Sequence, residues 1–581
     1  MIRFVQPRSQ EWRTKINLHL SLCITACAAL FTSHALAAGV DVCRATPANV
    51  DLRIDISRNA SGAVATFRFD QPISCLRFTE AGPVRKLTWT MLTPGAQLAE
   101  DGNTVLLASP RRSFKIQLRA FARDGQIDRT YSPVIVFGDD RAAAIYTKYL
   151  LSDAISRKTT FRFTGFSPLA ATARIGPQIE RASEHATYLI VGRPPLEQQG
   201  KASLIIDQAM PPWLKTTLVT QLRNGAAALS TIAPLPEKVT YLLTYTEPQQ
   251  MGATWRGDTL HQLVRLNFIG AKWQAEDAAA VATINQFVFH ELFHTINHRV
   301  QQGKPGDGTL SLLEGSAEAA AATLAHRSGA LDDAGFVAAK DGALMRCLAV
   351  SGDTLGAKEK TNTRNAPYAC GEVLQYLSAA TLKDGAGDML TIWQALLRRQ
   401  NGQAFGWADY FAALRLLADD TKQTQLSMLE KLVAGELPWR DVLASFESQG
   451  TLRKLGSAAL HQPQHSHFYA QLTLSHMLDN DCSGQRGYMH DGAVYTLDAP
   501  PQSCKLLPDK FRLVGVNGHR LASAGYDAYL ELVNRCAAGE DMELQAEGGE
   551  QRQLGCRAPL RPVQLYSFGA HPSPMSSPLN R

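Results

Sequence analysis

The segment His290-Glu291-Leu292-Phe293-His294 decides which kind of fold this chain adopts. It lies in a stretch, starting near Glu276, whose apolar spacing predicts a helix. Histidines four residues apart project from one face of a helix, so both imidazoles can bind one zinc ion through bonds of about 2.0–2.1 Å. Glu291, beside the first histidine, can take a proton from water that the ion makes acidic. Such short patterns also occur by chance in ordinary helices, so a metal site needs further support.

A third ligand is predicted in the following helix. Glu314 stands twenty residues after His294, where a glycine-rich loop, 303–308, passes into an alanine-rich helical segment. A catalytic zinc site takes three protein ligands plus water, and a carboxylate from a neighbouring helix completes that set. Glu318 lies one turn further on the same face, where it can accept a hydrogen bond from a ligand histidine. The alternative is two solvated glutamates, but the flanking leucines and alanines predict a buried helix.

These two segments together resemble the gluzincins, zinc peptidases whose third ligand is a glutamate followed by glycine, as in Glu314-Gly315. The closer resemblance is to the glycyl aminopeptidase-like family, whose first helix continues as Ser/Thr-x-Asn, here Thr295-Ile296-Asn297. It implies one Zn²⁺ held by His290, His294 and Glu314, with Glu291 as general base. Asn297 and Glu318 are expected to support the ligands, and the substrate is expected to be a peptide or protein.

The segment Ala366-Pro367-Tyr368-Ala369-Cys370-Gly371 extends the resemblance. It looks like the Pro-Tyr-Glu-Lys-Gly segment of related zinc aminopeptidases, whose tyrosine hydroxyl stabilises the tetrahedral oxyanion. Tyr368 is therefore the candidate for that role, because a phenol can donate to developing negative charge. Tyr376 is the second candidate, and the alternative is that either tyrosine only packs in a helix.

One departure concerns the substrate. Aminopeptidases of these families carry Gly-x-x-Glu ahead of the zinc helix, and that glutamate pairs with the substrate's free amino group. The corresponding stretch here, Gly252-Ala253-Thr254-Trp255-Arg256-Gly257-Asp258, contains no glutamate. Asp258 can substitute only if the loop is rebuilt, so aminopeptidase and endopeptidase activity both stay open.

The chain is predicted to be multidomain. Its 581 residues exceed one hydrophobic core, and 45% apolar with 19% charged residues is typical of globular protein. The expected fold is a β-sandwich-like N-terminal domain, a thermolysin-like α+β catalytic domain running into an α-helical region, and a C-terminal PDZ-like α/β domain. The predicted ranges are signal peptide 1–38, β-rich domain 39–140, catalytic domain 141–325, helical domain 326–470, PDZ-like domain 471–562 and flexible tail 563–581.

Local patterns predict several elements of the catalytic domain. Strands are expected at 203–207, 239–245 and 262–269, the last alternating like an edge strand beside a cleft. A helix should open at Pro211-Pro212 and stop at Asn224-Gly225. From about Glu276 to Leu455 the spacing is helical almost throughout, and short strands are expected after Leu455.

The N-terminus predicts export. Four basic residues precede the apolar stretch 16–36, which closes on Ala35-Leu36-Ala37, the pattern of a cleaved signal peptide. A membrane-anchoring helix and a lipid anchor at Cys27 are the alternatives. Without residues 1–37 the formal net charge falls from +6 to +3, because four bases and one acid are lost. The predicted protein is periplasmic or secreted, has no nucleic-acid partner and has no membrane span after cleavage.

Cysteine usage agrees with export. Eight cysteines follow the signal peptide and fall into four local groups, which favours nearest-neighbour disulfides. The expected pairs are Cys43–Cys75, Cys347–Cys370, Cys482–Cys504 and Cys536–Cys556. The rival is a zinc-cysteine site, although the sequence contains no Cys-x-x-Cys.

The C-terminal segment 508–519 resembles the Gly-Asp-x-Ile-x-x-Val-Asn-Gly stretch of PDZ domains, which bind peptide ends by adding a strand to a sheet edge. A carboxylate-binding loop is only weakly matched by Gly487-Tyr488-Met489-His490, so a peptide ligand and a purely structural role both stay open. His461, His465 and His467 are interpreted as a solvated interdomain loop. The rival to the enzyme is a peptide-binding or scaffolding protein with an inactive zinc fold.

Overall fold

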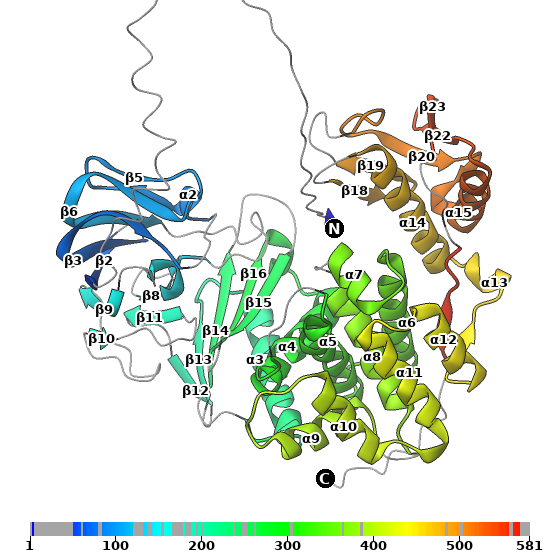
Figure 1. Ribbon diagram of the computed structural model, residues 1–581, viewed down its shortest axis with the longest axis horizontal. Coiled ribbons are helices and arrows are strands. Elements are labelled where there is room, and N and C mark those ends of the chain that lie inside the picture. The colour runs from blue at the N-terminus through cyan, green and yellow to red at the C-terminus, as the bar shows by residue number, and fades with distance from the viewer. Residues whose placement is uncertain are drawn as a thin grey trace, which may run out of the picture. The chain divides into compact units, whose positions relative to one another are not determined.

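The computed structural model of the chain is shown in Figure 1. The residues that it describes are 3–4, 50–59, 62–79, 84–119, 132–136, 142–152, 156–164, 178–180, 188–192, 196–199, 202–235, 239–246, 254–260, 263–301, 306–362, 365–383, 387–482, 486–498, 504–556, 560 and 562–569. The chain divides into two compact units, Asn17–Ser230 with Pro234–Ile296, and Met1–Ile16 with Thr231–Ala233 and Asn297–Arg581. The fold is multidomain and mixed α/β, while the predicted domain boundaries stay predictions. Apart from Arg3–Phe4, the predicted signal peptide lies outside the described residues.

The unit that contains Pro234–Ile296 starts with a seven-stranded sheet of order β10-β9-β2-β3-β6-β4, with β5 on β6. Its strands are β2 (Val50–Asn59), β3 (Gly62–Arg77), β4 (Trp89–Met91), β5 (Ala96–Leu98), β6 (Thr104–Arg119), β9 (Ser156–Thr164) and β10 (Gln178–Glu180). A three-stranded sheet, β11-β8-β7, consists of β7 (Val134–Val136), β8 (Ala142–Tyr146) and β11 (Tyr188–Gly192). One apolar core joins residues of both sheets. Because β9 pairs with β2, the sheet extends beyond residue 140.

A five-stranded sheet follows, in the order β12-β13-β14-β16-β15. Its strands are β12 (Leu196–Gln199), β13 (Ala202–Ile206), β14 (Val239–Thr246), β15 (Thr254–Leu260) and β16 (Leu263–Ile269). The strands expected at 203–207, 239–245 and 262–269 are confirmed within a residue or two at each end.

The prediction that 262–269 forms an edge strand is wrong, because β16 lies between β14 and β15 and all its residues are buried. Its polar side chains are satisfied inside the sheet. Arg265 pairs with Asp258 of β15, and Thr244 of β14 donates to Asn267 at 2.9 Å. The strand at this edge of the sheet is β15.

Two helices, α3 (Pro212–Ser230) and α4 (Ala278–Asn297), belong to the same region of the chain. Helix α3 begins at Pro212 as predicted, but it continues past Asn224-Gly225, so the predicted stop is wrong. A Cβ at Gly225 would lie 2.5 Å from Leu292 and 2.8 Å from Phe289 of α4. The glycine therefore permits close contact between the two helices and does not end one of them.

The second unit contains a helical region (Figure 1). Its helices are α5 (Thr309–Arg327), α6 (Asp333–Ala349), α7 (Leu355–Thr361), α8 (Ala366–Ala380), α9 (Met389–Gln400), α10 (Trp407–Leu417), α11 (Gln423–Ala434) and α12 (Trp439–Ser448). Helix α5 is largely buried, as its leucines and alanines predict. Helix α9 buries an apolar stripe that includes Met389, Ile392 and Trp393.

The C-terminal region is a sheet of order β1-β18-β19-β20-β22-β23, with β21 on β20. Its elements are β1 (Arg3–Phe4), β18 (Arg486–Asp491), β19 (Val494–Asp498), β20 (Arg512–Val516), β21 (His519–Arg520), β22 (Met542–Ala546), β23 (Gln551–Leu554), α14 (Pro463–Asp481) and α15 (Leu521–Ala538). The core between this sheet and its helices includes Leu474, Leu513 and Leu532. The PDZ-like assignment stays a prediction.

The prediction that only short strands follow Leu455 is wrong, because α13 (Ser457–Leu460) and α14 come next. The three histidines therefore do not form a solvated loop. His461 contacts Ser457 O and Asp527, His465 is buried against Ala459 O at 2.7 Å, and His467 contacts the Tyr495 hydroxyl at 3.0 Å. Each ring is held by a partner of its own.

The predicted tail begins with an ordered strand. Strand β24 (Tyr566–Phe568) pairs with β17 (Leu452–Lys454), and Leu565 is fully buried. Asp341 of α6 accepts hydrogen bonds from the Ser567 hydroxyl and the Phe568 amide at 2.6 and 2.7 Å. A flexible tail from 563 is therefore wrong as far as residue 569, and the rest lies outside the described residues.

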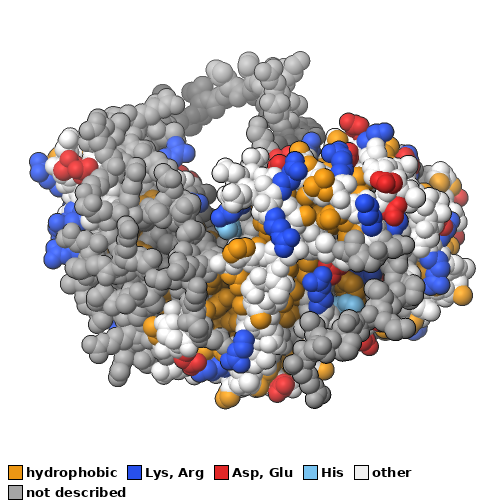
Figure 2. Space-filling model, turned by 90° about the horizontal axis from the view of Figure 1, so that it is seen from below, with side chains coloured by type: hydrophobic (Ala, Val, Ile, Leu, Met, Phe, Trp, Pro, Cys, Tyr) orange, Lys and Arg blue, Asp and Glu red, His pale blue; other side chains and the backbone are white. Residues whose placement is uncertain are grey.

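Three disulfides join nearest-neighbour cysteines, Cys347–Cys370, Cys482–Cys504 and Cys536–Cys556. Cys75 is buried in β3 and is also disulfide-bonded, while Cys43 lies outside the described residues. Among the helices that the structure describes, none combines the length and the apolar character needed to cross a membrane. Figure 2 shows basic and acidic side chains interspersed over the described part of one face.

Candidate metal centre

His290 and His294 lie one turn apart on α4 and point toward each other. Their Nε2 atoms are 3.1 Å apart, and their rings are nearly perpendicular with centroids at 4.8 Å. Two nitrogens on one tetrahedral zinc ion, each bonded at 2.0–2.1 Å, would be about 3.3 Å apart. His290 is 8% exposed, so its ring is largely withdrawn from bulk water. The helix therefore presents a histidine pair whose spacing suits a small cation.

Glu291 is held by the edge strand β15. The Thr259 hydroxyl donates to the Glu291 carbonyl oxygen at 2.7 Å and lies 3.3 Å from Oε2. Gly257 lies so close that an added Cβ would be 2.2 Å from Oε1. The carboxylate is thus placed by one hydroxyl and by the absence of a side chain at residue 257.

Asp258 lies on the opposite face of β15 from Gly257 and Thr259. It forms an ion pair with Arg265, whose side chain is fully buried and lies over the Tyr188 ring at 5.3 Å. The pair holds β15 against β16, where the two residues are direct cross-strand partners. Asp258 is therefore used inside the sheet, and the structure does not present it as a substitute for the missing amine-binding glutamate.

Glu314 lies in the second turn of α5, next to the point where α5 crosses α8. A Cβ on Gly315 would be 2.2 Å from the Cα and carbonyl carbon of Gly371, and a Cβ on Gly371 would be 2.2 Å from Ser311 O. The two helices therefore meet backbone to backbone. Only glycine at both positions allows this contact. The contact therefore determines the position of Glu314 relative to α8.

The N-terminus of α5 is capped from outside the helix by Glu359 of α7, which is 1% exposed. Its carboxylate accepts hydrogen bonds from the amides of Gly306, Gly308 and Ser311 at 3.2, 3.0 and 3.2 Å, and from the Ser311 hydroxyl. These amides have no partner within the helix, and a negative charge at this end is favoured by the helix dipole. Glu359 thus fixes the start of the helix that carries Glu314.

Glu359→Gln is expected to lower the free energy of unfolding by about 1–3 kcal/mol, because an amide NH₂ would face backbone N–H groups that need an acceptor. Chemical denaturation of the purified protein measures the change. Glu436→Gln, the same substitution at an exposed residue, is the control and should change stability by less than about 0.5 kcal/mol. Equal stability of both variants would contradict the capping role.

Asn297 is the last residue of α4 and is fully buried. Its Nδ2 donates to the carbonyl oxygen of Leu313 at 2.8 Å and to the Ser316 hydroxyl at 3.0 Å. Both partners flank Glu314 on α5. Asn297 therefore supports the segment that carries the glutamate, while direct support of a histidine stays a prediction.

Glu318 lies in the electrostatic environment of Arg346 and Glu372. Arg346 contacts Glu372 at 2.8 Å, and the Tyr376 hydroxyl donates to the same carboxylate at 2.8 Å. Burial raises the pKa of Glu372 to about 7 although Arg346 lowers it, and Glu318 raises it as well. Glu318 thus belongs to a charge cluster around the buried Glu372, and its hydrogen bond to a ligand histidine stays a prediction.

The tyrosine candidates differ in position. Tyr376 is 6% exposed and bound to Glu372, and burial raises its pKa well above the usual value, so it fits a packing role. Tyr368 is partly exposed and lies in the first turn of α8. Two residues later Cys370 bonds to Cys347 of α6, which fixes this end of α8.

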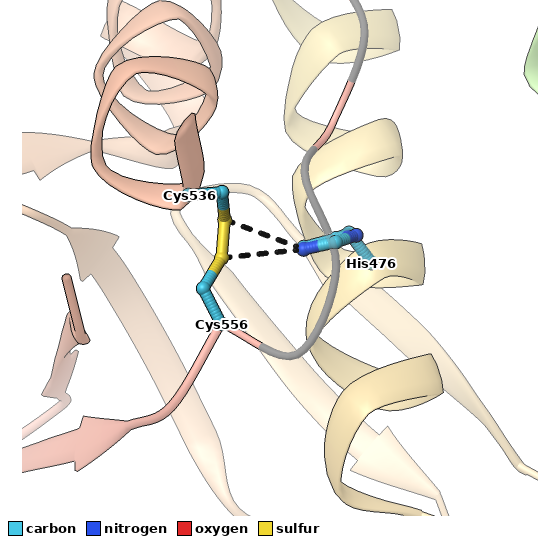
Figure 3. Close-up of side chains that lie close together, drawn as sticks. All are labelled: His476, Cys536 and Cys556. Atoms are coloured by element: carbon cyan, nitrogen blue, oxygen red, sulfur yellow. Dashed lines mark hydrogen bonds between the residues drawn. A yellow bond between two sulfur atoms is a disulfide. The ribbon is translucent and has the colours of Figure 1, made fainter. Parts of the chain in front are cut away.

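Two other groups of side chains in the described chain have metal-ligand chemistry, and both contain a disulfide. In Figure 3, His476 Nε2 of α14 lies 3.5 Å from Cys536 Sγ and 3.6 Å from Cys556 Sγ, and the two sulfurs are bonded to each other. Asp481 stands beside the Cys482–Cys504 bridge in the same way. Sulfurs that are bonded in a disulfide carry no thiolate, so neither group competes as a zinc site.

Sequence reasoning missed Gly257, Thr259 and Glu359. A glycine inside a strand pattern indicates a close approach by another group, so Gly257 carried a usable signal. Thr259 and Glu359 act across distances of 32 and 48 residues or more along the chain, and no local pattern marks them.

The fold is similar to that of a known class of protein. A crystal structure of an aminopeptidase N family protein from Idiomarina loihiensis matches with a TM-score of 0.52 and 12% sequence identity, covering 89% of this chain and 96% of that chain. No protein-family model matches the sequence, and no curated protein matches it. At this identity the comparison shows a shared fold. It does not show the glycyl aminopeptidase-like family or the PDZ domain.

Proposed function

We propose that this protein is an exported zinc metallopeptidase, in which His290, His294 and Glu314 hold one Zn²⁺ and Glu291 is the general base. The donor set fits the ion: each of the three ligands offers an atom, and these atoms lie within 4.8 Å of one another. Two neutral imidazoles and one carboxylate are a usual set for catalytic zinc. The observation that carries the proposal is the spacing of the His290, His294 and Glu314 ligand atoms, and it is supported by the contacts of the Glu291 carboxylate with Thr259 and Gly257.

A bound zinc ion would supply Lewis acidity, which polarises a carbonyl and lowers the pKa of water. The residues of the chain transfer the protons and stabilise the oxyanion. Glu291 accepts a proton from the attacking water and can pass it to the leaving amine. Tyr368 donates a hydrogen bond to the oxyanion that forms at the scissile carbonyl.

Metal analysis combined with peptide hydrolysis tests the proposal. Protein purified from an oxidising compartment should contain about one zinc per chain and hydrolyse peptides from a diverse mixture. A chelator should abolish hydrolysis, and added Zn²⁺ should restore it. Hydrolysis that survives complete removal of the metal would refute the zinc mechanism.

Tyr368→Phe is expected to keep zinc and to lower kcat by about 10²–10³, because one donor to the oxyanion is lost. Tyr376→Phe is the control. It removes a hydroxyl that contacts Glu372, so stability should fall while kcat changes little. Unimpaired turnover in Tyr368→Phe would exclude the role of this hydroxyl.

A second candidate function is peptide binding by the C-terminal module without catalysis. One observation favours it: Arg3 and Phe4 pair antiparallel with Gly487 and Arg486, so an extended segment adds a strand to the edge of this sheet at β18. Peptides are bound in this way by strand-addition modules. If the wild type and Glu291→Gln bind peptides equally and neither hydrolyses them, the binding function would replace the enzymatic one.

A further inference from the structure

The face of β15 that holds the general base also carries an exposed tryptophan. Side chains alternate along a strand, so Trp255, Gly257 and Thr259 share one face, and residues two apart are separated by roughly 7 Å. Gly257 and Thr259 contact Glu291. Trp255 is therefore the next residue on the same face of the strand after Gly257, which lies against Glu291.

The Trp255 indole is 47% exposed, which is unusual for so large an apolar side chain. It is held from below, because it contacts the Trp273 ring edge to face, with centroids 5.9 Å apart and planes at 89°. Trp273 is 2% exposed, and its Nε1 donates to Thr254 O at 3.0 Å. Phe268 lies 5.0 Å from the Trp273 ring. The buried rings of Trp273 and Phe268 thus support the Trp255 indole, which still presents surface to solvent.

The chemistry of this strand suits an apolar partner. Asp258 is the one acid among residues 254–260, and it lies on the other face in its ion pair with Arg265. β15 is also the sheet edge, so its outer backbone groups face away from β16. Near Glu291, β15 therefore offers an aromatic surface and no carboxylate that could pair with the amino terminus of a substrate.

We propose that Trp255 is a specificity-determining residue, which selects peptides with a bulky apolar side chain close to the scissile bond and requires no free amino terminus. The inference rests on the proposed peptidase function and deepens it. Burying the exposed part of the indole against a leucine or phenylalanine side chain of the substrate stabilises the complex, and an alanine offers too little surface to do so.

The test compares kcat and KM for two N-acetylated peptide series that differ only in Leu or Phe against Ala near the cleaved bond. Trp255→Ala should lower kcat/KM for the Leu and Phe peptides about tenfold, mainly through KM, and should change the Ala peptides less than about twofold. Trp255→Phe should recover most of the loss. Leu196→Ala, an exposed apolar residue on the opposite edge strand of the same sheet, is the control and should have no effect.

Three results would overturn the proposal: an equal loss for all peptides, no loss at all, or hydrolysis that is abolished by N-acetylation of the substrate. Failure of the peptidase function itself is recognised separately, because the wild type would then cleave none of the peptides, whether N-acetylated or with a free amino terminus. In that case, calorimetric binding of the same peptides to the wild type and Trp255→Ala still tests the selection, and equal affinities would reject it. Thermal unfolding monitored by circular dichroism confirms that the variants fold.

Discussion

Glu291→Gln is expected to leave the zinc content unchanged and to lower kcat by about 10²–10⁴. Glutamine has nearly the same shape, so it can keep the contact with Thr259 and fit beside Gly257. It cannot accept the proton of water, because an amide is not basic near neutral pH. Since Glu291 is not one of the proposed ligands, the metal should remain bound.

The measurement is zinc by atomic spectroscopy together with initial rates on a cleaved peptide. Glu276→Gln, which makes the same chemical change at an exposed residue just before α4, should behave as the wild type. Loss of zinc in Glu291→Gln would show that the residue binds or orients the metal. Full activity with full zinc content would remove it as the base.

Gly315→Ala is expected to have the largest effect on stability. Its new methyl would lie 2.2 Å from the backbone of Gly371, and backbone atoms in the middle of α8 cannot rotate away as a side chain can. Overpacking of this kind costs about 1–3 kcal/mol, occasionally more, and separation of α5 from α8 would also move Glu314. We therefore expect a lower denaturation midpoint and a lower zinc affinity.

Gly342→Ala in α6 is the matched control, because it is the same substitution in a helix interior. Its Cβ would meet only the end of the Arg346 side chain, at 3.4 Å. Without a clash, alanine should stabilise the helix by about 0.5–1 kcal/mol. The two variants should thus shift the denaturation midpoint in opposite directions, and a neutral Gly315→Ala would show that α5 and α8 can separate without cost.

The parts of the fold that follow from local spacing could be predicted from sequence. Helix α4 with its histidine pair and the buried helix α5 are encoded by residues three and four apart, and nearest-neighbour cysteines define three bridges. Two of the errors share one cause. Gly225 was interpreted as a helix stop and Arg265 as part of an edge strand, because the partners that use them, Phe289 and Asp258, come from other elements.

The site shows the same limit. His290, Glu291 and His294 are recognisable from sequence, because two possible zinc ligands and a carboxylate lie within one turn of a predicted helix. Thr259 and Glu359, which hold Glu291 and the start of α5, act through tertiary contacts. No local sequence pattern predicts these contacts. Tyr368 lies in the first turn of α8, where Pro367 suits the start of a helix, and the sequence alone does not show which way its hydroxyl points.

The disulfide between α6 and α8 has a practical consequence for making the protein. It closes a loop with a sequence separation of 23 residues, which is worth about 3 kcal/mol in the entropy of the unfolded chain. Expression in a reducing cytosol would forgo that contribution and loosen the helix that carries Tyr368. A weak activity measured on such material would then reflect the host compartment, and secretion or oxidative refolding is the appropriate route to an active preparation.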